Sequence, residues 1–149
     1  MAKQVLVVDD DRNAVKYLSA VLNEHGYEPV PAYDGNEGLQ KIEQAKPGLI
    51  VLDVMMPKKS GLVLFKQLKR DERYKDIPIL MLTGVSGMIE ELESHKDDTS
   101  EKPYDSLREA LKRTIQDLRE EGLVKPEMFV DKPIDPDSFV AKVQELIGS

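Results

Sequence analysis

Two unbroken apolar runs in this sequence end directly in aspartate, which places carboxylates at the ends of two predicted buried strands. Gln4–Val8 precedes Asp9 and Asp10, and Leu49–Leu52 precedes Asp53. Taken alone, Asp53 would as readily end a strand or cap a turn as take part in chemistry. If both runs are neighbouring parallel strands, their carboxyl ends meet at the edge of the sheet where such sheets bind ligands. The three carboxylates would then lie together and repel one another unless a cation neutralised them.

Two further strand ends carry side chains that suit phosphoryl transfer. Thr83 ends the apolar run Ile77–Leu82, and Lys132 follows the short run Met128–Val130 after one residue. A cluster of hard oxygen ligands that leaves room for water favours Mg²⁺. A lysine ammonium and a threonine hydroxyl both suit the oxygens of a transferring phosphoryl group. Because no serine, cysteine or histidine stands at these strand ends, the acceptor must be a carboxylate, and Asp53 is the best placed.

These strand ends are positioned by a βα pattern that repeats along the chain. Helices are predicted where apolar residues recur every three to four positions between a cap and a stop. The predicted strands are Gln4–Val8, Tyr27–Ala32, Leu49–Asp53, Ile77–Leu82 and Met128–Val130. The predicted helices are Arg12–His25, a helix from the turn Asp34–Asn36 to Ala45, a helix capped by Ser60 that ends about Glu72, and Pro136–Ile147. Right-handed crossovers then give an α/β fold, a doubly wound parallel sheet with helices on both faces.

The segment Val85–Glu127 interrupts this pattern before the last strand. It holds 12 acidic and 7 basic residues. A long helix is predicted over Pro103–Glu121, because Pro103 suits the first turn and Gly122 suits the residue after the last. Its apolar stripe would pack on the domain, or it would form a dimer surface or a partner-docking face. Both alternatives stay open at this point.

Composition excludes several classes of protein. A chain of 149 residues with 40% hydrophobic and 33% charged residues suits one folded domain. The absence of cysteine excludes disulfides and thiolate metal sites, so a cytoplasmic location is expected. A net charge of −7 argues against direct binding to nucleic acid or to an anionic membrane surface. No apolar run approaches the roughly 18 residues that span a membrane. The two histidines, His25 and His95, each stand alone.

The motifs together resemble the receiver domain of two-component response regulators. The matching residues are the acidic pair Asp9-Asp10, Asp53 with the following Met55-Met56-Pro57, Thr83-Gly84, and Lys132-Pro133. Each motif is weak alone, but their order and spacing are those of the family. The resemblance implies a flavodoxin-like five-stranded sheet of strand order 2-1-3-4-5 with an extra long helix before the last strand. It covers residues 1–149 as one receiver domain, with 85–127 as an atypical helical insertion.

The resemblance also implies a role for each matching residue. Asp53 accepts a phosphoryl group from a phosphohistidine on a sensor histidine kinase or a histidine phosphotransfer protein. Asp10, Asp53 and the backbone carbonyl of Met55 would ligate Mg²⁺, and Asp9 would help through a water. Thr83 and Lys132 would contact phosphoryl oxygens. Phe129 matches the aromatic position whose rotamer follows phosphorylation, so Thr83 and Phe129 are the expected switch residues.

Three functions remain open on the sequence. The leading one is a phosphoryl-accepting switch, not an enzyme beyond slow loss of its own phosphoryl group. Its expected output is contact with an unknown downstream protein, unless the sequence is a fragment of a longer regulator. The second is a constitutive interaction module without regulated phosphorylation. The third is a Mg²⁺-dependent phosphohydrolase, although no general acid or base is evident close to Asp53 in the sequence. A homodimer through 85–127 is an additional open expectation.

Overall fold

The computed structural model of the chain describes residues 3–54, 61–83, 113, 115–122, 129–131 and 134–148. Its strands are β1 (Gln4–Val8), β2 (Glu28–Ala32), β3 (Leu49–Asp53), β4 (Ile79–Thr83) and β5 (Phe129–Asp131). Its helices are α1 (Arg12–Glu24), α2 (Gly35–Gln44), α3 (Gly61–Lys69) and α6 (Pro136–Ile147). Residues 113 and 115–120 are also helical. Within the described ranges, no helix has the length and apolar character needed to cross a bilayer.

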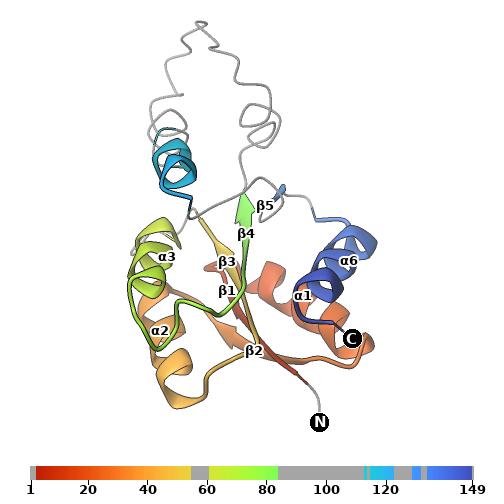
Figure 1. The fold of residues 1–149 in the computed structure, drawn as a ribbon. Coiled ribbons are helices and arrows are strands. Elements are labelled where there is room, and N and C mark those ends of the chain that lie inside the picture. The colour runs from red at the N-terminus through yellow and green to blue at the C-terminus, as the bar shows by residue number, and fades with distance from the viewer. Residues whose placement is uncertain are drawn as a thin grey trace, which may run out of the picture.

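The five strands form one parallel sheet in the order β2-β1-β3-β4-β5. β1, β3 and β4 have almost wholly buried side chains, as their continuous apolar sequences predict for strands covered on both faces. Because all strands run the same way, their carboxyl ends meet at the upper edge in Figure 1. The doubly wound fold predicted from the sequence is confirmed, including its strand order.

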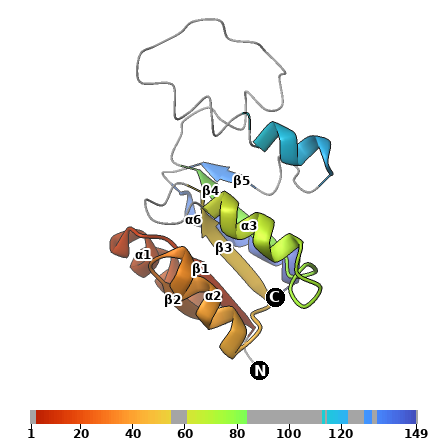
Figure 2. The same cartoon turned by 90° about the vertical axis from the view of Figure 1, so that its left-hand side faces the viewer.

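Two apolar clusters hold helices against the two faces of the sheet. On one face α1 and α6 bury side chains against the odd-numbered residues of β1 and β3 (Figure 1). On the other face α2 and α3 pack with the helical residues 115–120, as the turned view in Figure 2 shows. Ile115 and Leu118 are the side chains that these residues contribute, and both are fully buried. The predicted apolar stripe therefore packs on the domain along its described part.

The edge strand β2 contains two prolines whose positions follow from its pairing with β1. The amide of Glu28 donates to the carbonyl of Lys3 at 2.9 Å, and the carbonyl of Ala32 accepts from Asp9 at 3.1 Å. Residues that direct their backbone groups to one side alternate along a strand. Pro29 and Pro31 therefore face away from β1, where their lack of an N–H costs the sheet no hydrogen bond.

The ends of α6 and of α1 are fixed by side-chain caps. Asp11 accepts hydrogen bonds from the amides of Asn13 and Ala14 at the start of α1. Asp135 accepts from the amide of Ser138 at 2.9 Å at the start of α6, and this bond lowers the pKa of its carboxyl group. At the far end of α6, the Tyr27 hydroxyl donates to the carbonyl of Gly148 at 2.6 Å.

Two predicted boundaries were wrong by a few residues. β4 begins at Ile79, not Ile77, because Pro78 has no N–H to contribute to a strand and the Ile77 amide instead closes a turn to Tyr74. α3 ends at Lys69, three residues before the predicted end. There the Asp71 carboxylate accepts from the amide of Arg73 at 2.9 Å, which replaces the helical pattern by a local turn.

Candidate functional site

The carboxyl edge of the sheet gathers the polar side chains that the sequence singled out. Asp9, Asp53 and Thr83 are the only polar or charged residues that the structure buries among those it describes. The register explains their proximity, because Val8 lies beside Leu52, and Asp53 lies beside Leu82. Burying an aspartate costs free energy unless a partner or a bound ion compensates. Two buried carboxylates at the edge where parallel sheets bind ligands are candidates for a cation site.

The acidic cluster consists of Asp9, Asp10 and Asp53. Each offers a carboxylate oxygen, and the three oxygens lie within 4.8 Å of one another. Asp10 is exposed, whereas the other two are buried. Opposite ligands on one Mg²⁺ lie about 4.2 Å apart, so small side-chain movements or a bridging water would let one ion bind here. The donor set of hard oxygens with one open side fits Mg²⁺ better than a transition metal.

Asp9 is held in place by the backbone that follows it. One of its carboxylate oxygens accepts a hydrogen bond from the amide of Asp11 at 3.0 Å. Asp11 itself begins α1 as its N-cap, as the sequence predicted. The turn from β1 into α1 therefore orients Asp9 and presents Asp10 to solvent.

Asp53 is held in place by the start of α3, and the sequence reasoning missed the residue responsible. A Cβ atom placed on Gly61 would lie 2.0 Å from the backbone oxygen of Asp53 and 2.8 Å from the Cα of Val54. Real Cβ atoms essentially never come within 3.0 Å of such atoms. Only glycine lets α3 begin this close to Asp53. The sequence does contain a signal for this role. Gly61 stands in the first turn of a predicted helix although glycine has a low helix propensity, so another constraint must select it.

Thr83 and the last strand complete the described part of the site. Thr83 is the final residue of β4, is fully buried, and pairs with Asp131 of β5. Lys132 follows Asp131 directly, but Lys132, Met55 and Gly84 lie outside the described residues. The roles predicted for Lys132 and for the Met55 carbonyl therefore stay predictions.

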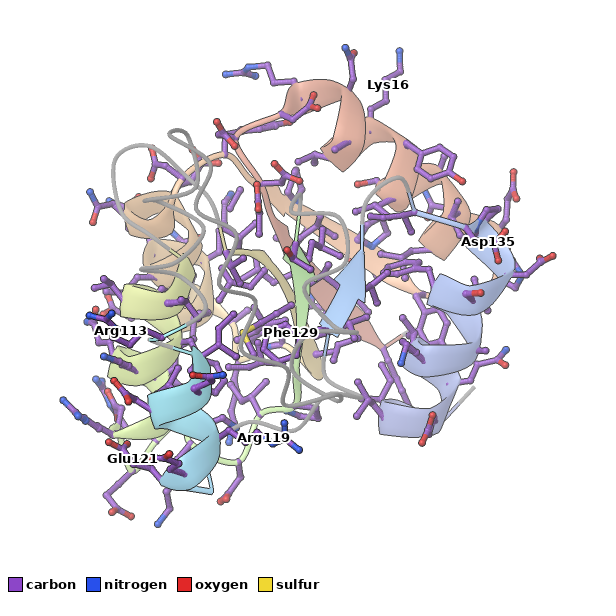
Figure 3. All side chains as sticks on the ribbon, turned by 90° about the horizontal axis from the view of Figure 1, so that it is seen from above. Lys16, Arg113, Arg119, Glu121, Phe129 and Asp135 are labelled. Carbon is purple, nitrogen blue, oxygen red and sulfur yellow. The ribbon has the colours of Figure 1, made fainter. Side chains whose placement is uncertain are left out.

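Phe129 lies on β5, the strand that pairs with the end of β4 where Thr83 stands. Phe129 opens β5, two residues before the partner of Thr83, and its side chain is buried in the cluster that contains Ile115 and Leu118. Figure 3 looks down on the carboxyl edge and shows Phe129 between the sheet and the helical residues that carry Arg113, Arg119 and Glu121. The phenyl ring thus connects the strand next to Thr83 with the 115–120 helix.

Comparisons with known proteins identify the same family that the sequence motifs resemble. A sequence model described as the response regulator receiver domain matches residues 5–116. The alkaline phosphatase synthesis transcriptional regulatory protein PhoP of Bacillus subtilis is 41% identical over 129 residues, which are 85% of this chain and 52% of that protein. The DNA-binding dual master transcriptional regulator RpaA of Synechocystis is 39% identical over 119 residues, 78% of this chain and 49% of that protein. The chain thus spans about half the length of these relatives.

Solved structures share the fold over nearly the whole chain. The chemotaxis protein CheY4 of Vibrio cholerae superposes with a TM-score of 0.71 at 27% identity, covering 98% of this chain and 99% of that one. A putative response regulator of Chloroflexus aurantiacus superposes with a TM-score of 0.69 at 26% identity, and the match covers 100% of both chains. β5 and α6 lie beyond the residues that the family model matches, but β5 pairs with β4 in the same sheet. This chain belongs to the response regulator receiver domain family.

Proposed function

We propose that the chain is a switch that accepts a phosphoryl group on Asp53 from a phosphohistidine of a histidine kinase or a histidine phosphotransfer protein. The observation that carries the proposal is the buried carboxylate of Asp53 beside Asp9 and Asp10. Receiver domains are signalling phosphoacceptors and generally not enzymes, which favours a switch over a phosphohydrolase. Residues 1–149 form one receiver domain in this proposal, with 85–127 as an insertion.

The transfer needs an attacking carboxylate, a cation that neutralises the negative charge around the phosphoryl group, and contacts to the three phosphoryl oxygens. A carboxylate oxygen of Asp53 attacks phosphorus, while the bond from phosphorus to the donor breaks and the donor retains the electron pair. Asp9, Asp10 and Asp53 would hold Mg²⁺, which when bound neutralises charge on the acidic cluster and on the phosphoryl oxygens. Thr83 donates a hydrogen bond to one oxygen, and Lys132 pairs with another.

The phosphorylated state acts through β5 and the helix beside it. Phosphorylation replaces the single negative charge of the Asp53 carboxylate by about −1.5 to −2 charges on the phosphoryl group, at a buried edge of the sheet. Attraction of Thr83 to that charge moves the end of β4, and its neighbour β5 carries Phe129 toward or away from Ile115 and Leu118. A downstream protein that reads this face receives the signal. Self-association through residues 85–127 is part of the proposal.

The test is phosphorylation by a small donor. Purified protein is incubated with acetyl phosphate and Mg²⁺, and the intact mass is measured. We expect an 80 Da increase in the wild type, none in Asp53→Asn, and none when Mg²⁺ is removed with a chelator. Asp11→Asn serves as the matched control, because Asp11 caps α1 from the same turn without entering the cluster. A wild type that gains no mass, or an Asp53→Asn variant that gains as much as the wild type, would refute the proposal.

A further inference from the structure

The carboxyl edge over β1 and β2 is strongly acidic. Asp9 and Asp10 belong to the acidic cluster, Asp11 caps α1, and Asp34 caps α2 by accepting from the amide of Glu37 at 2.8 Å. A phosphoryl donor is itself an anion, so these carboxylates oppose its approach. Besides Mg²⁺ and Lys132, a further cation at this edge that is not bound to a carboxylate would favour the approach of the donor.

Arg12 is a cation with that property. It is exposed and follows Asp10 by two residues. Its guanidinium carbon lies 4.2 Å from the centre of the Tyr33 ring. Within the part of the chain that the structure describes, Arg12 has no ion pair. A cation over an aromatic face is held electrostatically without using its N–H donors, so those donors stay available for an anion.

Tyr33 holds the arginine at the end of the sheet where Asp9 follows β1. Tyr33 directly follows Ala32, whose carbonyl accepts from the amide of Asp9 at 3.1 Å. The ring is half-buried and packs against the apolar cluster of the α1 face, so its position is fixed by the core. The ring thereby fixes the guanidinium of Arg12, the second residue after Asp10, at the turn from β1 into α1. Arginine suits this place because its planar fork binds phosphate oxygens through two parallel hydrogen bonds.

We propose that Arg12, held by the Tyr33 ring, binds the anionic phosphoryl group of the incoming donor and positions it for transfer to Asp53. The proposal rests on the proposed function of Asp53. The group that Arg12 recognises is the phosphoryl group shared by acyl phosphates and phosphoramidates, not the part of the donor that leaves. The phosphorus bond to the donor breaks and the bond to the Asp53 oxygen forms while Arg12 keeps all its protons.

The test compares rates of phosphorylation by two small donors, acetyl phosphate and phosphoramidate, each at saturating Mg²⁺. We expect Arg12→Gln to lower the second-order rate constant about tenfold with both donors, which is the lower end of the loss of a hydrogen bond to a charged group. Arg12→Lys should recover part of the rate because it keeps the charge without the fork. Lys16→Gln is the matched control, since it removes the same charge one turn along α1 from a side chain that projects away from the sheet (Figure 3); its rate should change less than twofold.

Tyr33 variants separate the ring from its hydroxyl. Tyr33→Phe keeps the ring and should keep the wild-type rate, whereas Tyr33→Leu should lower the rate to near that of Arg12→Gln. Equal rates for Arg12→Gln and the wild type would overturn this proposal but leave the proposed function standing, because both proteins would still be phosphorylated. An equal loss in Lys16→Gln would also overturn it, since long-range attraction would then suffice. A loss with only one donor would overturn it as well, because Arg12 would then contact the leaving group.

Discussion

Replacing Gly61 by alanine is the most direct test of how the fold positions Asp53. The added Cβ would lie 2.0 Å from the Asp53 backbone oxygen, about 1.4 Å short of the 3.4 Å at which ordinary contact begins. The carbonyl carbon of Asp53 and the Cα of Val54 would both lie 2.8 Å away. All three atoms belong to the backbone, so no side-chain rotation relieves the overlap. Either the start of α3 or the end of β3 must move.

The size of the effect follows from that displacement. Overpacking of this kind costs about 2–3 kcal/mol, which lowers the melting temperature of a domain of this size by about 5–10 °C. A misplacement of about 1 Å at a reacting group costs about 100-fold in rate. We therefore expect Gly61→Ala to fold with reduced stability in urea and thermal unfolding followed by circular dichroism, and to accept phosphate from acetyl phosphate about 100 times more slowly.

The matched control is Gly48, which directly precedes β3, whereas Asp53 ends that strand. A Cβ on Gly48 would find the Gln4 carbonyl oxygen at 3.5 Å, which is ordinary contact. Gly48→Ala should therefore keep both the melting temperature and the phosphorylation rate near those of the wild type. A Gly61→Ala protein that melts and is phosphorylated like the wild type would show that α3 does not begin against Asp53, and the account of how Asp53 is held would be wrong.

Three further changes test other parts of the structure. Leu118→Ala should lower the free energy of unfolding by about 2–5 kcal/mol in urea titration, because it leaves a cavity in a fully buried cluster; a loss below 0.5 kcal/mol would contradict the packing of residues 115–120. Tyr27→Phe should cost about 1 kcal/mol in the same assay by removing the bond to the Gly148 carbonyl, and an unchanged midpoint would contradict that bond. Hydrogen bonds to Ser138 lower the pKa of Asp135, so the cap contributes stability above the ordinary aspartate pKa of about 4 and loses it as the pH falls through the lower folded value. Asp135→Asn should therefore flatten the pH dependence of the melting temperature below pH 4. If the melting temperature of the variant falls with pH as steeply as that of the wild type, this explanation is refuted.

The sheet and the acidic cluster could be predicted because both depend on local patterns that tertiary contacts did not override. Continuous apolar runs ending in Asp9-Asp10, Asp53 and Thr83 are read directly from the chain, and parallel pairing brings their ends together. Helix α1 was predicted within one residue at its end, since Asp11 caps it and Gly26, with a φ of +84°, stops it.

The missed features depend on particular contacts that the spacing of apolar residues does not predict. Gly61 carries no periodic signal, and its requirement appears only when the Asp53 backbone is placed beside it. The contact between Arg12 and Tyr33 joins two turns that the sequence separates by 21 positions. The early end of α3 arises from a side-chain bond of Asp71, which competes with a helical pattern that apolar spacing alone would extend.

The prolines of β2 prevent another strand from pairing regularly with this edge of the sheet. An incoming strand pairs with an exposed edge through N–H and C=O groups that alternate along it. At the outer side of β2 both central positions are proline, so that edge presents acceptors but no amide donors at Pro29 and Pro31. The sheet therefore does not grow past β2, and a second copy of the chain or a partner that approaches from this side must dock through side chains. The opposite edge strand, β5, has no proline within Phe129–Asp131 and lies beside the residues that we propose respond to phosphorylation.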